Sequence, residues 1–115
     1  MNNFVSLHNH TAQGSNIRFL DSTNRPEDMI DKAISLGYKG MAFTDHECLS
    51  AAVNIIKKRD AIQDKNKDFK IIFGNEIYLI DEKEVKNTRD YFHFILLAKD
   101  ITGWQQIKEL SSRAW

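Results

Sequence analysis

Two histidines stand two residues apart near the start of the chain, in the segment Leu7-His8-Asn9-His10-Thr11. Because alternate side chains of a strand point to one face, we expect both imidazoles to project together from the end of a first strand, about 6–7 Å apart along the backbone. Imidazole binds zinc, iron, nickel and copper, and carboxylate ligands add tolerance for manganese or magnesium. Taken alone, the His-x-His pattern favours two solvated histidines in a turn, so the positions of the other histidines decide the interpretation.

The remaining histidines and one glutamate also lie at the edges of expected strands. His46 follows an apolar run over 40–44, Glu76 follows a glycine at an expected break in a third strand, and His93 lies near the start of a fourth. If the strands are parallel, their carboxyl ends bring the first histidine pair, His46 and Glu76 to one rim. His93 reaches that rim only if 77–80 and 92–98 form a hairpin. Together these positions favour a metal site made of several histidines and a carboxylate.

Each of these residues also has a purely structural interpretation. His93, between two phenylalanines, fits a core histidine bonded to a backbone carbonyl, and Glu76 fits a solvated residue at a strand break. Asp45 is expected either to cap the second helix or to orient His46 through a hydrogen bond. Cys48 fits a small residue in the first turn of a helix better than a nucleophile. The sequence contains no serine or cysteine nucleophile motif and no glycine-rich phosphate loop of the Walker or Rossmann type.

The elements that must position these residues alternate between strand and helix. The apolar pattern predicts strands over 3–7, 40–44, 71–73 and 92–98, with a further extended stretch over 77–80 after an interruption. It predicts helices from Pro26, capped by Asn24, to Gly37, over 48–63, and from Asp100 or Thr102 to the end of the chain. The long segment 8–25 and the charged segment 81–90 are predicted loops. This alternation is typical of an α/β fold in which helices cover parallel strands.

Composition bounds the remaining choices. The 115 residues make one domain or a piece of one, and 42% hydrophobic residues are too many for a disordered segment. Sixteen basic residues balance sixteen acidic ones, so no overall charge attracts nucleic acid or an anionic membrane. The single cysteine excludes an internal disulfide and fits a reducing compartment. With no membrane-spanning run and no signal-peptide pattern, we expect a cytoplasmic location and no membrane partner.

Three motifs resemble, in order and spacing, those of the PHP (polymerase and histidinol phosphatase) superfamily: Leu7–Thr11, Gly40–His46 and Gly74–Glu76. The later run His93–Lys99, followed by Gly103-Trp104 and Leu110-Ser111-Ser112, resembles the PHP domain at the N-terminus of bacterial DNA polymerase III alpha subunits. The segment Ser15–Ser22 is similar to the variant of phage-type or low-GC Gram-positive alpha subunits. The resemblance covers essentially the whole sequence.

This resemblance implies a distorted β/α barrel with metal ions at the carboxyl ends of its strands. The implied cofactors are two or three divalent ions, either Zn, Mn or Fe. The implied ligands are His8, His10, Asp21, His46, Glu76 and His93. Among them, His8, His10 and Glu76 are expected to take part in catalysis, and Asp45 to support the ligands from behind.

The superfamily completes its cluster with a later His or Cys and a late Asp-x-His, which are absent from this sequence. The chain is also shorter than the ~250 residues of an eight-stranded barrel. We therefore expect residues 1–115 to be the N-terminal portion of a PHP domain, an incomplete barrel within a larger polymerase chain. Such a barrel leaves a sheet edge open, which favours self-association or pairing with a partner.

The implied reaction of the complete domain is metal-dependent hydrolysis of a phosphoester, with 3′–5′ removal of nucleotides as its specific form. DNA and replisome subunits are the implied partners, and the fragment alone is expected to catalyse little. Two alternatives stay open. One is a free-standing PHP phosphatase of small phosphomonoesters such as histidinol phosphate, and the other is a non-catalytic scaffold.

Overall fold

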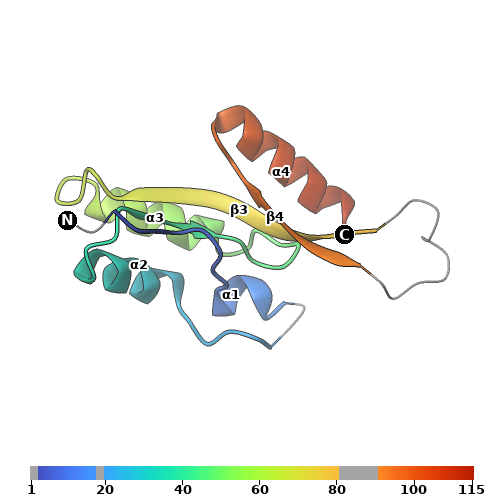
Figure 1. Cartoon of the computed structure of the whole chain (residues 1–115), viewed down its shortest axis with the longest axis horizontal. Coiled ribbons are helices and arrows are strands. Elements are labelled where there is room, and N and C mark those ends of the chain that lie inside the picture. The colour runs from blue at the N-terminus through green and yellow to red at the C-terminus, as the bar shows by residue number, and fades with distance from the viewer. Residues whose placement is uncertain (1–2, 18–19, 81–90) are drawn as a thin grey trace.

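The computed structural model describes residues 3–17, 20–80 and 91–115 (Figure 1). In chain order its elements are β1 (Val5–Ser6), α1 (Ala12–Ser15), α2 (Pro26–Ser35), β2 (Gly40–Phe43), α3 (Ala52–Ile62), β3 (Lys70–Leu79), β4 (Phe92–Leu97) and α4 (Ile101–Arg113). The predicted loop over 81–90 lies outside the described residues. None of the helices in the described ranges has the length and apolar character needed to cross a membrane.

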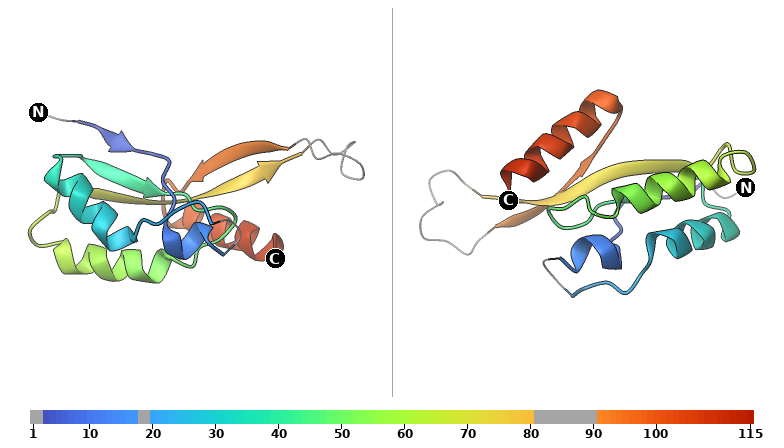
Figure 2. Two further views of the ribbon diagram at one scale, coloured as in Figure 1. Left: turned by 90° about the horizontal axis from the view of Figure 1, so that it is seen from below. Right: turned by 180° about the vertical axis from the view of Figure 1, so that it is seen from behind.

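The four strands form one curled sheet in the order β1-β2-β3-β4. β1 pairs with β2 and β2 with β3 in parallel, whereas β4 pairs with β3 in antiparallel register. Within the described residues the helices lie on one side of this sheet, which has the shape of a half-barrel (Figure 2). The predicted α/β class is confirmed. The general expectation of parallel strands does not hold for β4, which pairs antiparallel with β3. The hairpin between the extended stretch after residue 76 and 92–98, the stated condition for His93 to reach the rim, is confirmed.

β3 is a continuous strand of ten residues, so the predicted interruption at 74–76 is wrong. The strand changes partner there, because residues up to Phe73 pair with β2 and residues from Gly74 pair with β4. A Cβ on Gly74 would lie 2.4 Å from the carbonyl oxygen of Leu96 and 2.9 Å from Cγ2 of Thr44. The glycine therefore allows two neighbouring chains to approach closely and does not end the strand.

The hydrophobic core lies between the parallel part of the sheet and helices α2 and α3. It consists of six buried residues, Ile30, Ala33, Met41, Phe43, Ala51 and Ile55. β2 is buried along its whole length, as predicted, whereas residues 71–73 of β3 are only half-buried. Burying each of the four large side chains, Ile30, Met41, Phe43 and Ile55, contributes about 1.5–3 kcal/mol, so this cluster fixes the parallel strands whose carboxyl ends carry the histidines.

The helix boundaries differ from the prediction at two starts. α2 begins at Pro26, but its N-cap is Arg25 without a side-chain hydrogen bond, so Asn24 is not the cap. α3 begins at Ala52 and not at residue 48, and its Val53 side chain is 59% exposed. The predicted start of the last helix at Asp100 is confirmed, because its carboxylate accepts a hydrogen bond from the Gly103 amide at 2.9 Å.

The predicted loop before α2 contains the short helix α1. Thr11 caps it by accepting a hydrogen bond from the Gly14 amide at 2.9 Å, and the Ala12 amide donates to the Asn24 carbonyl at 2.8 Å. A helix of only four residues carries too little periodicity to be recognised in a sequence. It folds the segment after His10 back over the carboxyl end of the sheet.

Candidate metal centre

The side chains of His8 and His10 converge on Glu76 at the carboxyl end of the parallel strands. Nε2 of His8 lies 2.7 Å from Oε2 of Glu76, and Nε2 of His10 lies 2.6 Å from the same oxygen. The two Nε2 atoms are 3.1 Å apart. The predicted convergence of the two imidazoles is therefore confirmed, although Glu76 lies within β3 and not at a break in it.

His46 reaches the same place because the end of β2 stays in register with β3. His46 and Glu76 form an isolated parallel bridge, and the Glu76 amide donates to the Asp45 carbonyl at 3.0 Å. The chain then turns at Glu47, whose positive φ of 49° is uncommon for a residue other than glycine. The Glu47 backbone amide donates to the Glu76 carbonyl at 2.9 Å. This bond ties the turn to β3 and so fixes the position of the His46 backbone.

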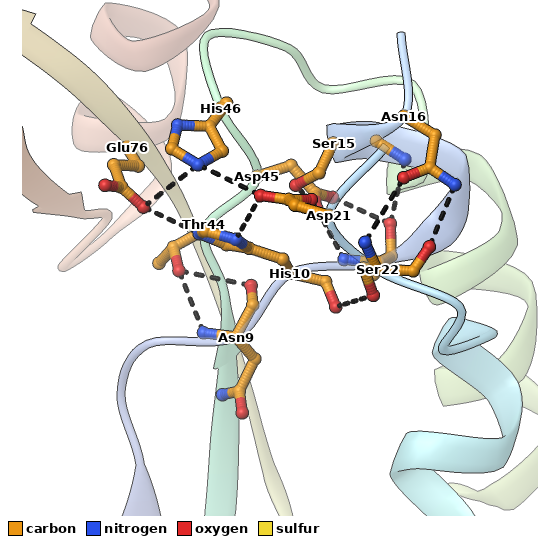
Figure 3. Close-up of polar contacts among 12 residues, drawn as sticks. Asn9, His10, Ser15, Asn16, Asp21, Ser22, Thr44, Asp45, His46 and Glu76 are labelled. Carbon is orange, nitrogen blue, oxygen red and sulfur yellow. Dashed lines mark hydrogen bonds and ion pairs between the residues drawn. The ribbon is translucent and has the colours of Figure 1, made fainter. Parts of the chain in front are cut away.

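Asp21 joins the cluster from the loop between α1 and α2 (Figure 3). Its Oδ2 lies 3.2 Å from Nδ1 of His10 and 3.2 Å from Nε2 of His46. The loop is held in place by Ser22, whose hydroxyl donates to the His10 carbonyl at 3.0 Å. The position predicted for Asp21 in this loop thus lies beside two of the predicted ligands.

His93 comes from β4 and meets the other oxygen of the same glutamate. Its Nδ1 is hydrogen-bonded to Oε1 of Glu76, and its ring lies edge-on to that of His46 with centroids 5.7 Å apart. The hairpin makes this possible, because β4 runs antiparallel to β3 and places His93 opposite Tyr78. The alternative interpretation of His93 as a core histidine is wrong, since its side chain is 52% exposed.

The six predicted ligands form three overlapping sets whose donor atoms lie within 4.8 Å of one another. We call these the His8 set (His8, His10 and Glu76), the Asp21 set (His10, Asp21 and His46) and the His93 set (His46, Glu76 and His93). Glu76 belongs to two sets and presents a different oxygen to each, Oε2 to His8 and Oε1 to His93. A carboxylate with this arrangement can bridge two neighbouring ions.

The donor types fit divalent ions. Ligand atoms about 2.0–2.2 Å from an ion lie roughly 3–3.4 Å from one another, and the His8 and His10 nitrogens are 3.1 Å apart. Imidazole with carboxylate is a donor set suited to zinc, iron and manganese. Glu76 and His46 are only 3% and 7% exposed, whereas His8 is 54% exposed. The cluster is therefore buried on the side of Glu76 and His46 and accessible on the side of His8.

The charge states of the two buried members suit a cation. Burial raises the pKa of Glu76, but hydrogen bonds from His8, His93 and His10 and the charge of His46 outweigh it and lower this pKa to about 2. Burial lowers the pKa of His46, against the opposing effect of the Glu76 and Asp21 carboxylates. At neutral pH Glu76 is thus ionised and His46 is neutral, the protonation states that metal ligands need.

Asp45 is directed at the α1 segment. Its carboxylate accepts hydrogen bonds from the Thr11 backbone amide at 2.6 Å and the Thr11 hydroxyl at 2.9 Å. It also accepts one from the Ser15 hydroxyl at 2.9 Å (Figure 3). It does not cap α3, whose N-cap is Ala51. The expected bond from Asp45 to the His46 ring gives way to these contacts, and Nδ1 of His46 instead lies 3.4 Å from the Tyr78 hydroxyl. Asp45 therefore fixes the segment that carries His10 and leads to Asp21.

The sequence analysis missed two polar residues that hold the strand ends. The backbone amide of Asn9 donates to the Thr44 hydroxyl at 3.0 Å, and its side-chain amide donates to the Ala42 carbonyl at 2.8 Å. Asn75, 1% exposed, donates to the carbonyls of Asp45 and Cys48 at 2.9 and 3.1 Å. The only signal for either residue was its position next to a candidate ligand.

Comparisons with known proteins identify relatives of this chain. A model of the PHP domain matches residues 6–115. The probable DNA polymerase YorL of Bacillus subtilis (strain 168) is 42% identical over 122 residues, which cover 96% of this chain and 9% of that protein. The DNA polymerase III subunit alpha of Treponema pallidum (strain Nichols) is 33% identical over 117 residues, which cover 97% of this chain and 9% of that protein. The chain thus spans about a tenth of these relatives.

Solved structures share the fold. A putative metal-dependent phosphoesterase from Bifidobacterium adolescentis superimposes with a TM-score of 0.61 at 18% identity, over 91% of this chain and 32% of that protein. An amidohydrolase from Chromobacterium violaceum superimposes with a TM-score of 0.58, also at 18% identity. At this identity the match is one of fold alone. The family-model match over residues 6–115 and the identity to YorL show that the chain belongs to the PHP domain family. Its curled four-stranded sheet is an incomplete barrel of the PHP type.

Proposed function

We propose that this chain carries the metal centre of a phosphoesterase PHP domain within a larger DNA polymerase chain. The observation that carries the proposal is the position of Glu76, whose Oε2 faces His8 and His10 and whose Oε1 faces His93. His8, His10, Asp21, His46, Glu76 and His93 would be the ligands. Zn, Mn or Fe are the ions that this donor set favours.

The residues of the chain prepare the site in three ways. Glu76 supplies a fixed negative charge at the base of the cluster, because its pKa is lowered to about 2. His46 stays neutral, because burial lowers its pKa. His8 and His93, 54% and 52% exposed, form the rim that a substrate would reach. Bound divalent ions would supply Lewis-acid activation of water and stabilise the charge that develops on a phosphoryl group.

The substrate class that we propose is a phosphodiester, specifically the 3′ end of a DNA strand. One observation supports this choice, because YorL and the Treponema pallidum subunit are DNA polymerases. In this proposal His8, His10 and Glu76 take part in catalysis by holding the ions beside the reacting phosphorus, and the rest of the polymerase chain completes the barrel.

The test uses the complete polymerase chain proposed above, here called the full chain, loaded with Mn²⁺ or Zn²⁺. We expect hydrolysis of bis(p-nitrophenyl) phosphate and shortening of a 5′-labelled oligonucleotide, and both activities should disappear in the His8→Ala/His10→Ala variant. A preference for p-nitrophenyl phosphate over the diester would contradict the proposed substrate and favour a phosphatase of small phosphomonoesters. Bound metal without hydrolysis of either compound would contradict the proposed catalysis and favour a scaffold.

A further inference from the structure

Tyr78 reaches the metal centre from the same face of the same strand as Glu76. The two residues stand two positions apart on β3, so their side chains point the same way. The Tyr78 hydroxyl lies 3.4 Å from Nδ1 of His46, and the two rings are nearly parallel at 21° with centroids 6.0 Å apart. Tyr78 therefore lies behind the His46 ring, on the side away from the carboxylates.

The two nitrogens of His46 face different partners. Nε2 lies 3.2 Å from Oδ2 of Asp21 and 3.8 Å from Oε2 of Glu76, so it is the nitrogen offered to an ion. A ligating nitrogen carries no proton, and a neutral imidazole has only one. In the ion-bound state that proton must therefore stand on Nδ1, where it needs an acceptor. A hydroxyl can accept such a bond or donate one, so Tyr78 suits this nitrogen both with and without an ion.

We propose that Tyr78 is a positioning residue, which accepts a hydrogen bond from Nδ1–H of His46 and so fixes the tautomer and the orientation of this ligand. The proposal rests on the proposed metal centre. It predicts a local effect, because His46 belongs to the Asp21 set and the His93 set but not to the His8 set. Loss of the hydroxyl should therefore weaken ion binding at the His46 side and leave the His8 side intact.

Packing makes a clean substitution available. Tyr78 lies opposite His93 in the hairpin, and the two rings meet edge-on with centroids 4.8 Å apart. The Tyr91 ring also packs against the Tyr78 ring, with centroids 4.6 Å apart. The Tyr78→Phe variant keeps these ring contacts and removes only the hydroxyl. A matched control is Tyr38→Phe, because Tyr38 packs against Phe4 at 4.7 Å near the opposite end of the parallel strands.

The first measurement is a Co²⁺ titration of the full chain, followed by visible absorption and by competition with a chromophoric chelator. We expect Tyr78→Phe to weaken one class of Co²⁺ sites about 10- to 100-fold, the usual effect of removing a partner behind a ligating histidine. Its d–d spectrum should change at the same time. Tyr38→Phe should alter neither the dissociation constants nor the spectrum.

The second measurement is the ring N–H signal of His46 in the Zn²⁺-loaded full chain, observed by ¹⁵N-correlated NMR. We expect a protected Nδ1–H signal in the parent protein and in Tyr38→Phe, and rapid exchange of this proton in Tyr78→Phe. Equal Co²⁺ affinities and an unchanged N–H signal in all three proteins would overturn the positioning role and leave the metal centre standing. A lower Tm for Tyr78→Phe with unchanged affinity would overturn it too. A parent chain without bound Co²⁺ would overturn the metal centre itself.

Discussion

The Oε2 oxygen of Glu76 lies 2.7 Å from Nε2 of His8, although 68 positions of the chain separate the two residues. This contact depends on two parallel strand pairings, because β1 and β3 both pair with β2 and therefore end at the same edge of the sheet. The buried base and the exposed rim follow from the same arrangement, since Glu76 lies within a strand and His8 lies after one. The following predictions test what depends on it.

Substituting Glu76 by glutamine keeps the shape of the side chain and removes its charge. Because Glu76 belongs to both the His8 set and the His93 set, we expect Zn²⁺ affinity to fall by more than about 100-fold, beyond the usual effect of a partner behind a ligand. Isothermal titration with chelator competition measures this change. Glu27→Gln, in the first turn of α2, is the control and should bind Zn²⁺ like the parent. Equal affinities of the two variants would show that Glu76 holds no ion.

Substituting Asp45 by asparagine should destabilise the segment over the metal centre. The buried carboxylate accepts three hydrogen bonds from Thr11 and Ser15, and an amide group would turn a donor toward donors. We expect the free energy of unfolding to fall by about 2–4 kcal/mol in urea denaturation with a chelator present. The exposed pair of Asp60 with Arg59 gives the control, because Asp60→Asn should cost less than about 1 kcal/mol. Similar losses for both variants would contradict this role of Asp45.

Two glycines give a second matched comparison. A Cβ on Gly14 would lie 1.9 Å from Oδ2 of Asp45, whereas the nearest atom to a Cβ on Gly103 is 3.5 Å away. Gly14→Ala should therefore lower Tm and weaken metal binding, because it displaces Asp45. Gly103→Ala should be neutral or raise stability by up to about 1 kcal/mol, since alanine favours a helix. Differential scanning calorimetry decides the matter, and a Gly14→Ala protein as stable as Gly103→Ala would refute the buried contact.

The stability of the metal-free chain should fall as the pH falls. Burial lowers the pKa of His46 below 6.5, so the unfolded chain takes up a proton before the folded one, and stability is lost below about pH 6.5. For Glu76, burial raises the pKa. Its hydrogen bonds to His8, His93 and His10 and the charge of His46 outweigh this effect and lower the pKa from 4.5 to about 2. This second contribution is present above pH 4.5 and is lost as the pH falls through about 2.

Urea denaturation at several pH values, with a chelator present, measures this dependence. A His46→Gln variant should show a flatter profile than the parent around pH 6.5, because glutamine does not titrate. A parent protein whose stability rises as the pH falls from neutrality, relative to this variant, would contradict the lowered pKa of His46.

The sequence was most informative where chemistry and periodicity coincide. The strand order along the chain and the positions of His8, His10 and His46 after apolar runs were enough to predict their convergence, because parallel strands bring their carboxyl ends to one edge. The hairpin that carries His93 was only one of two interpretations. Its antiparallel direction depends on long-range pairing with β3, which a local pattern of apolar residues does not record.

The errors have a common physical origin. Gly74 was interpreted as a strand break because glycine often ends a strand. In the structure this position has to be glycine for another reason, because the Leu96 carbonyl lies too close for a Cβ atom. Asp45 was expected at a helix cap or at His46, and its actual partners lie about thirty residues earlier in the chain. Tyr78 carried no motif at all. Each depends on tertiary contacts that bring distant segments together.

The most direct test of the metal centre is the number of ions bound to the full chain. After dialysis against Zn²⁺ or Mn²⁺ and removal of free ion, elemental analysis should find more than one ion per chain, because Glu76 offers an oxygen to each of two sets. The His8→Ala/His10→Ala variant should retain at least one ion fewer. A parent chain without bound metal, or equal metal content in both proteins, would contradict the account.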